Sequence, residues 1–435
     1  MKLIIVIVMI LCLLYMIAKK KWNAFLSMLF IAILTGICLG LPLPKIMDVF
    51  EEGMGNLLGS LALILGLGAM IAQLMEESGA ATALSKQLIK LFGAKWAQWS
   101  ILLIGVLIGF ALFFDAAFIL LIPIVLNVAK QLTVPPLYLG LPAAAALLTI
   151  HTFFPPHPGA VEIVRALKVN QGLLLVVGLF VAIPSMIVSG ILYSRYILRK
   201  ENIVKNKELS LTIEATPSFI KQSFLVMILP VLLIAIGSFV PMLCSIKMVN
   251  QIMQFIGHPV IALFITLIIV IYLFGYRQQK TTNELMDSLA FSVTTIALVL
   301  LINGAGGGLK QVLIAGGVTD EIQNIMSHLH LSPLLTGFIL TALMRVTLGS
   351  STIAAMTASS MVIGMNGVSG IDGVLVALAI GAGSMCASHV NDPGFWLFKQ
   401  YFNLSVKETF KTWTMMTIIG SLTSLLILNV LYILL

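Results

Sequence analysis

The chain has 435 residues, of which 60% are hydrophobic and only 10% are charged. Soluble globular domains carry about 25% charged residues, so this composition excludes an ordinary soluble protein and indicates one embedded in a lipid bilayer. The net charge of +8 is not taken as a sign of nucleic-acid binding, because the lysines and arginines fall in short loops where they act as topology signals.

Eight continuous apolar runs are long enough to predict helices that cross a bilayer, whose hydrocarbon core takes about 20 residues. In chain order they are residues 1–18, 23–41, 57–75, 172–193, 222–243, 258–274, 287–302 and 412–435. The first run is interpreted as a retained helix rather than a signal peptide, because its lysines follow the apolar core and no Ala-x-Ala cleavage pattern is present. We therefore expect an all-α polytopic membrane protein.

A polar stretch near the middle divides the chain into two halves. We expect residues 1–194 to form a first membrane repeat, residues 195–221 a cytoplasmic linker and residues 222–435 a second membrane repeat. With the linker inside, the positive-inside rule places both termini outside. The basic segments 19–21, 86–95, 277–280 and 399–411 then also lie inside. This arrangement requires a re-entrant hairpin and one broken crossing in each interrupted region, 97–165 and 333–400.

The two halves repeat one another at a spacing of about 235 residues. "PHPG" ends at Gly159 and "NDPG" ends at Gly394, and the same separation relates Asp115 in "FFDAAFILL" to Ser350 in "LGSSTIAAM". Because the second half starts on the opposite side of the membrane, the two repeats are predicted to be inverted, each with a hairpin and a discontinuous helix. Many secondary transporters have this layout and bind substrate near mid-membrane between the broken helices.

The segment "HTFFPPHPGA", residues 151–160, interrupts an apolar region with two histidines and three prolines. Proline lacks a backbone donor and restricts the residue before it, so we expect one half-helix to end before His151 and another to start after Gly159. Irregular backbone at membrane depth is tolerated where protein or a water-filled cavity satisfies it. The alternative is a surface loop with two solvated histidines.

A second helix break is predicted at "SHVNDPGFW", which contributes His389, Asn391 and Asp392 and is followed by Trp396 as an interface anchor. The glycine-rich stretch "NGAGGG" begins with Asn303, which can reach a site between the repeats. Close packing of helices accounts for its glycines without any role in binding, and we favour that interpretation.

Two charged residues lie inside the interrupted apolar regions. A carboxylate such as Asp115 is costly at membrane depth and typically serves in proton relay or cation coupling, although a structural pair with a lysine or arginine is the alternative. Arg345 is suited to bind a carboxylate through two parallel hydrogen bonds. Its alternatives are a pair with Asp115 or a side chain that reaches to the membrane surface. Residues 349–352 supply a flexible glycine and three hydroxyls after it.

No sequence motif indicates an enzyme or an ATP-driven pump. His151, His157, His389 and Asp392 are side chains of the kind that bind metal ions, but HExxH, paired cysteines, a Walker A motif and GxSxG are all absent from the sequence. We expect no metal and no other cofactor, and transport driven by an ion gradient remains. A metal-dependent membrane enzyme is the alternative of a different class.

The segments "HTFFPPHPGA", "ALMRVTLGSSTIAAMTASS" and "SHVNDPGFWLFKQYFNLSVKETFKTW" together resemble the gluconate permease family of bacterial gluconate:proton symporters, over essentially the whole chain. The resemblance implies a carrier of sugar acids in the bacterial inner membrane, within a superfamily of inverted-repeat ion transporters. Some members carry other hydroxy or amino acids, such as D-serine. Leu348 stands where the family typically has glutamine, and Pro393 where a small residue is common, so either departure points to a changed substrate preference.

From these observations we predict a secondary active transporter that imports gluconate or a related small sugar acid with protons. The predicted substrate-binding residues are Thr152, His157, Gly159, Arg345, Ser350, Ser351, Thr352 and Asn391. Asp115 is the first candidate for the proton carrier, followed by Asp392 and His389. The alternative is sodium coupling to another small carboxylate or to a hydroxy or amino acid. The expected partners are the substrate, protons and the lipid bilayer, without nucleic acid, and a homo-oligomer is compatible with the architecture.

Overall fold

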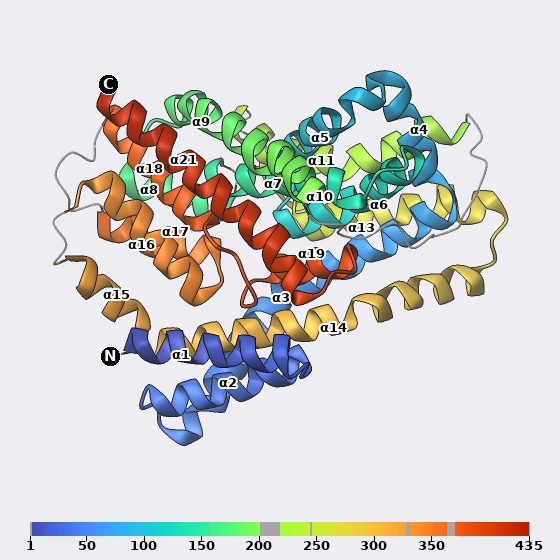
Figure 1. Cartoon of the computed structure of the whole chain (residues 1–435). Coiled ribbons are helices and arrows are strands. Elements are labelled where there is room, and N and C mark those ends of the chain that lie inside the picture. The colour runs from blue at the N-terminus through green and yellow to red at the C-terminus, as the bar shows by residue number, and fades with distance from the viewer. Residues whose placement is uncertain are drawn as a thin grey trace. The chain divides into compact units, whose positions relative to one another are not determined.

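A computed structural model describes residues 2–155, 157–200, 218–243, 246–327, 331–362 and 370–434, and every regular element in these ranges is a helix (Figure 1). The first half contains α1 (Lys2–Leu14), α2 (Ala24–Cys38), α3 (Leu43–Glu77), α4 (Ala80–Phe92), α5 (Ala97–Ala111), α6 (Phe114–Gln131), α7 (Pro136–Phe153), α8 (Pro158–Leu167), α9 (Gln171–Met186) and α10 (Tyr193–Lys200). The second half contains α11 (Ser218–Leu243), α12 (Lys247–Ile256), α13 (Pro259–Phe274), α14 (Thr282–Ala315), α15 (Val318–Ser327), α16 (Pro333–Leu348), α17 (Ser351–Val362), α18 (Gly370–Met385), α19 (Pro393–Tyr401), α20 (Val406–Thr409) and α21 (Met415–Leu434). The all-α prediction is confirmed.

Seven helices of the described residues are long and apolar enough to cross a membrane, and an eighth is added if α4 and α5, bent by 100° at their junction, count as one span. All eight apolar runs predicted from the sequence coincide with helices. The run 57–75 is the central part of α3, whose 35 residues extend well beyond the predicted boundaries. The chain is therefore a multi-pass membrane protein.

Several breaks between helices lie inside the two interrupted regions, and local sequence accounts for three of them. Residues 154–157 separate α7 from α8, which starts with Pro158 at the position where a missing backbone donor is harmless. Gly349, with a left-handed φ of 69°, ends α16, and Pro393 starts α19. The first break is shorter than expected, because α7 continues through His151 to Phe153.

The order of helices in the first half recurs in the second. Helix α2 begins at Ala24 and α13 begins 235 residues later at Pro259, as do α8 at Pro158 and α19 at Pro393. The break between α5 and α6 corresponds to the break between α16 and α17 at a slightly larger spacing, since α6 begins at Phe114 and α17 begins 237 residues later at Ser351. This periodicity in helix positions agrees with the periodicity read from the sequence motifs, while the orientation of the halves stays a prediction.

The chain forms two compact units, and each contains segments from both halves. Unit 1 comprises residues 1–60, 148–189 and 298–435, and unit 2 comprises residues 61–147 and 190–297. In unit 1, α16 packs against α17 and α18, and α8 packs against α17 (Figure 1). In unit 2, α11 packs against α4, α5, α12 and α13. Residues 201–217 of the predicted cytoplasmic linker lie outside the described residues.

Candidate functional site

The centre of the candidate site in unit 1 is an ion pair between Arg345 and Asp392. Arg345 lies near the C-terminal end of α16 and is only 3% exposed. Its Nη2 donates to Asp392 Oδ2, and its Nη1 donates to the carbonyl oxygen of Gly349 at 2.7 Å. Arg345 therefore forms an ion pair, as one of the alternatives in the sequence analysis proposed, but its partner is Asp392 and not Asp115.

Asp392 receives further hydrogen bonds that hold its carboxylate in place. Ser388 donates its hydroxyl to Oδ2, and the backbone N–H of Gly394 donates to Oδ1 at 3.1 Å, which makes Asp392 the N-cap of α19. A buried ion pair persists only if additional hydrogen bonds satisfy its remaining atoms. The carboxylate of Asp392 meets that condition, whereas the Nε of Arg345 has no partner among the described residues.

The break at residues 386–392 is bonded to the C-terminal end of α16. Asn391 Nδ2 donates to the carbonyl oxygens of Val346 at 2.8 Å and Thr347 at 3.2 Å, and His389 Nε2 lies 3.0 Å from the same Val346 oxygen. The last carbonyls of a helix have no partner within it, so these side chains supply partners that the helix lacks. The α16 end and the break thus form one local structure.

At two positions beside this break, the local geometry explains the type of residue. A Cβ on Gly349 would collide with the carbonyl oxygen of Asn391, so the close approach as well as the positive φ demands glycine. Trp396 is 5% exposed and donates its Nε1 to the carbonyl oxygen of Val390 at 2.7 Å. The expectation of an exposed interface anchor at Trp396 was therefore wrong, because the indole is used to close the break.

The two histidines of "HTFFPPHPGA" lie together at the break between α7 and α8. Their ring centroids are 4.7 Å apart, and His157 is 1% exposed, which does not fit a solvated surface loop. Thr152 is buried as well, and its hydroxyl donates back to its own helix, to the carbonyl oxygens of Leu148 at 3.1 Å and Thr149 at 3.2 Å. The Thr152 hydroxyl is thus used within its own helix, whereas the two imidazoles lie beside one another at the break.

The predicted hydroxyls after Gly349 meet the start of α8. A Cβ built on Gly159 would lie 3.4 Å from Thr352 Cα and 4.0 Å from its hydroxyl oxygen. Ser350 accepts a hydrogen bond from the backbone N–H of Ile353 at 3.4 Å at the start of α17. Ser350, Ser351 and Thr352 are each partly exposed, and the structure thus brings one member of this group beside the "HTFFPPHPGA" break.

Asp115 is the one predicted site residue that belongs to unit 2. It lies in the first turn of α6 and is partly buried. A carboxylate at this position is favoured by the partial positive charge of the helix N-terminus. All the other predicted site residues belong to unit 1.

Unit 1 concentrates buried polar atoms that have no hydrogen-bond partner among the described residues. They include Arg345 Nε, His389 Nδ1, Asn391 Oδ1 and both polar atoms of the Asn303 amide. Leaving a buried donor or acceptor unsatisfied costs about 1–3 kcal/mol, and native structures contain few such groups. Atoms of this kind beside two helix breaks are expected where a polar ligand or ordered water completes the hydrogen bonding.

One face of α14 adds two polar residues to this region. Asn303, Gly306 and Lys310 are spaced by three and four residues, so they share a face. A Cβ on Gly306 would lie 3.5 Å from the carbonyl oxygen of Asn391, which shows that this face meets the 386–392 break. Lys310 is half-buried and makes no hydrogen bond or ion pair within the described part of the chain.

The sequence interpretation underrated Asn303 and missed Lys310. The packing explanation fits Gly304 and Gly307, which contact Leu58 and Gly53 of α3, but it does not cover the buried Asn303 amide. Lys310 stands in "GGGLKQVLIA", an apolar context as unusual for a cation as that of Arg345. The criterion applied to Asp115 and Arg345 would have identified it.

A small cavity adjoins the site. Its volume of about 10 Å³ is on the order of one water molecule. Thr347, His389 and Asn391 line it on one side, and residues of α1, α2 and α14, mostly apolar, line the rest, with α1 lying along α14 (Figure 1). The described conformation thus leaves no room for a sugar acid at this point.

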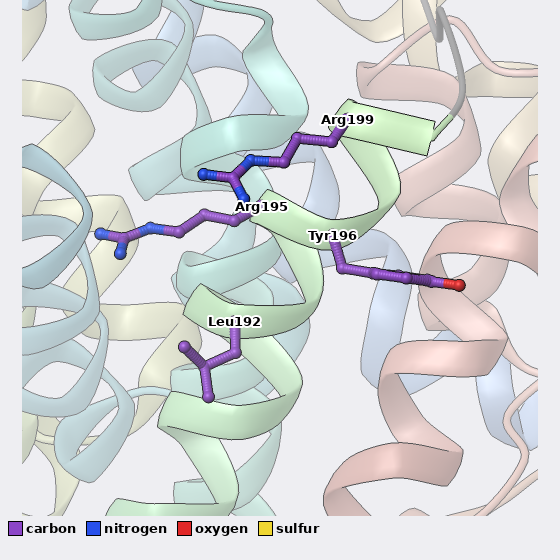
Figure 2. A pocket seen from close by; sticks show the side chains of 4 residues that line it. All are labelled: Leu192, Arg195, Tyr196 and Arg199. Carbon is purple, nitrogen blue, oxygen red and sulfur yellow. The ribbon is translucent and has the colours of Figure 1, made fainter.

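Two further features bear on other functions. No group of three or more histidine, cysteine, aspartate or glutamate residues within the described ranges is arranged to hold a metal ion. A pocket of about 490 Å³ lies in unit 2 and is lined by Leu192, Arg195, Tyr196 and Arg199 (Figure 2). These residues belong to the end of the long helix that contains α9 and α10, and not to the candidate site of unit 1.

Comparison with known proteins places this site in a family. The model of the GntP family permeases matches residues 1–434. The Gnt-II system L-idonate transporter of Escherichia coli K12 is 39% identical over 98% of both chains, and the gluconate permease of Bacillus subtilis 168 is 38% identical over 98% of both. A high-affinity gluconate transporter of Escherichia coli K12 is 37% identical, again over 98% of both chains. The crystal structure of the Alcanivorax borkumensis YdaH transporter is similar at a TM-score of 0.47 and 16% identity, covering 94% of this chain and 96% of that one. The chain belongs to the GntP permease family, whose named relatives are membrane transporters and not enzymes.

Proposed function

We propose that the protein imports gluconate, or a closely related sugar acid, across the bacterial inner membrane by proton symport. The names of its relatives, gluconate permease and L-idonate transporter, support this substrate class. The observation that carries the proposal is the set of buried polar atoms without partners around Arg345, Asn391 and Asn303. A polyhydroxylated carboxylate offers the donors, acceptors and negative charge that such a set would satisfy.

The proposed architecture consists of two inverted repeats, residues 1–194 and 222–435, joined by a cytoplasmic linker at 195–221. Both termini lie outside, and each repeat contributes one re-entrant hairpin and one discontinuous helix. The recurrence of helix breaks about 235 residues apart supports the repeat, and the positions of the lysines and arginines support its inversion. Discontinuous helices point their free backbone groups at a shared site, which is how inverted-repeat transporters bind substrate and coupling ions.

For the substrate carboxylate, the charges favour Lys310 as the primary partner. Arg345 already shares its guanidinium with Asp392 and Gly349, so in the described conformation only its Nε remains to be satisfied. Lys310 is the cation of this region without a partner among the described residues. Asn303 and Asn391 then address the substrate hydroxyls, together with His157 and the hydroxyls of residues 350–352.

For the proton, the contacts favour Asp392 over Asp115. A proton on Asp392 removes the negative charge that holds Arg345, so the guanidinium becomes available to the substrate. Proton and anion then bind together, and the free energy of one favours the other. Asp115 and His389 remain alternative carriers, Asp115 because of its position in an apolar segment.

The test is uptake of labelled gluconate into sodium-free proteoliposomes with an imposed inward proton gradient. We expect accumulation above equilibrium that disappears when a protonophore collapses the gradient. Accumulation that instead requires added sodium would contradict proton coupling. No uptake by folded protein, with idonate and D-serine also failing to compete, would contradict the substrate class.

A further inference from the structure

The pocket of unit 2 has the composition of a lipid headgroup site. The described residues that line it, Leu192, Arg195, Tyr196 and Arg199, follow one another at helical spacing near the end of a single long helix (Figure 2). The guanidinium groups of Arg195 and Arg199 extend to the same side of that helix in Figure 2. Two cations close together on one side attract an anion with more than one acceptor oxygen, and a phosphate group fits that description.

The length of the helix places this pocket at the membrane surface. Residues Gln171–Arg199 form one apolar span of 29 residues, which is about 43 Å at 1.5 Å per residue. The hydrocarbon core is about 30 Å thick, so a helix entering the core at Gln171 leaves it near Leu192. The segment from Leu192 to Arg199 is then about 10 Å long, comparable with the polar headgroup layer that flanks the core.

The exposed side chains agree with that placement. Leu192 is 51% exposed and Tyr196 is 56% exposed. An exposed leucine at the core boundary followed by a tyrosine in the headgroup layer is the usual order of residues at a membrane interface. The pocket therefore opens where acyl chains and headgroups meet.

Arg195 is held in a fixed orientation while leaving its charge available. Its Nε donates to Gln98 Oε1 at 2.7 Å, and Gln98 is itself 1% exposed. The amide of Gln98 donates to Tyr138 O at 2.9 Å and to the Ser194 hydroxyl at 2.8 Å. Within the described part of the chain, neither Arg195 nor Arg199 has an acidic partner. Among the described residues, the pocket thus has two positive charges without an acidic partner, and Gln98 holds one of them in a fixed orientation.

We propose that this pocket binds the phosphate of an anionic phospholipid, with Arg195 and Arg199 on the phosphate oxygens and Leu192 beside the start of the acyl chains. Basic pockets on the cytoplasmic side of transmembrane helices bind anionic headgroups in this way. The site is separate from the proposed substrate site and does not depend on the substrate or on the coupling ion.

The experiment is native mass spectrometry of the purified full-length protein, titrated with phosphatidylglycerol or phosphatidylcholine. We expect phosphatidylglycerol adducts at a lipid concentration at least fivefold lower than phosphatidylcholine adducts. Arg199→Gln should remove that preference, since Arg199 is exposed and forms no bond that supports the fold. Arg277→Gln is the matched control, because Arg277 is also an exposed arginine at a helix end but is not among the residues that line this pocket, and it should retain the preference.

Two results would overturn the proposal. Equal binding of phosphatidylglycerol by the wild type and by Arg199→Gln, both with unchanged melting temperature, would show that the pocket does not select the headgroup. Displacement of the lipid by 20 mM inorganic phosphate would show that the pocket takes a soluble phosphate and not a lipid. Retention of the lipid under the same phosphate challenge would support the lipid as the ligand.

Discussion

At the scale of single residues, the Arg345–Asp392 pair leads to a prediction about the coupling of substrate transport to protons. We expect Asp392→Asn to abolish proton-driven accumulation of gluconate in proteoliposomes while preserving exchange of labelled for unlabelled substrate. The neutral amide leaves Arg345 permanently available, so substrate binding no longer depends on a proton. Asp115→Asn is the comparison and should still accumulate substrate. The opposite pattern, with proton-driven accumulation lost only in Asp115→Asn, would identify Asp115 as the proton carrier.

Lys310 carries a prediction about affinity for the substrate. A hydrogen bond to a charged group contributes about 1.5–3 kcal/mol, and each 1.4 kcal/mol is a factor of ten. Lys310→Met should therefore raise the KM for gluconate by about tenfold to a hundredfold. Lys310→Arg should retain most of the affinity, and Lys247→Met, at an exposed lysine of α12, should leave KM unchanged. An unchanged KM in Lys310→Met would exclude Lys310 from the site.

Asn303 should show opposite effects on stability and on transport. Its buried amide lacks partners among the described residues, and such groups cost about 1–3 kcal/mol. Asn303→Leu, which is similar in shape, should therefore raise the melting temperature of the substrate-free protein while raising KM. A purely structural role for the amide would instead lower the melting temperature. Thermal unfolding with and without gluconate distinguishes the two cases, because only a binding role reduces stabilisation by the ligand.

At the scale of elements, the turn between α16 and α17 depends on Gly349. A left-handed backbone costs a residue with a Cβ about 1–2 kcal/mol, and here the Cβ would also collide with the Asn391 carbonyl. Gly40 offers the control, since its φ is +80° and nothing lies within 4 Å of a Cβ built there. We expect Gly349→Ala to lower the melting temperature clearly more than Gly40→Ala and to abolish transport. Equal losses would mean that the collision is relieved without consequence.

Sequence patterns were sufficient for the helices and for the places where they break. Apolar runs and prolines act locally, so the break after Phe153 and the start of α19 at Pro393 could be placed to within a few residues. The partner of Arg345 could not be identified in the same way, because Asp392 lies 47 positions away and three-dimensional packing selects it. Asn303 was undervalued and Lys310 was missed for a related reason. Only the contact of Gly306 with the 386–392 break reveals which way their face of α14 points.

At the scale of the whole molecule, the membrane topology determines whether the two repeats are parallel or inverted. A repeat in helix order alone is compatible with parallel or inverted halves. The distribution of lysine and arginine predicts the inverted form, because the positive-inside rule would place the start of the first half outside and the start of the second half inside. Inversion matters for function, since two oppositely oriented hairpins and broken helices can exchange access between the two sides around one site.

Two equivalent helix starts test the inversion directly. Asn23 is the N-cap of α2, and His258, 235 residues later, is the N-cap of α13. Both side chains are exposed. The inverted topology places position 23 in the cytoplasm and position 258 outside, whereas parallel repeats would place both on the same side. In a variant without native cysteines, we expect a membrane-impermeant thiol reagent added to intact cells to label His258→Cys and to spare Asn23→Cys until the membrane is permeabilised. Labelling of both, or of neither, before permeabilisation would contradict inverted repeats.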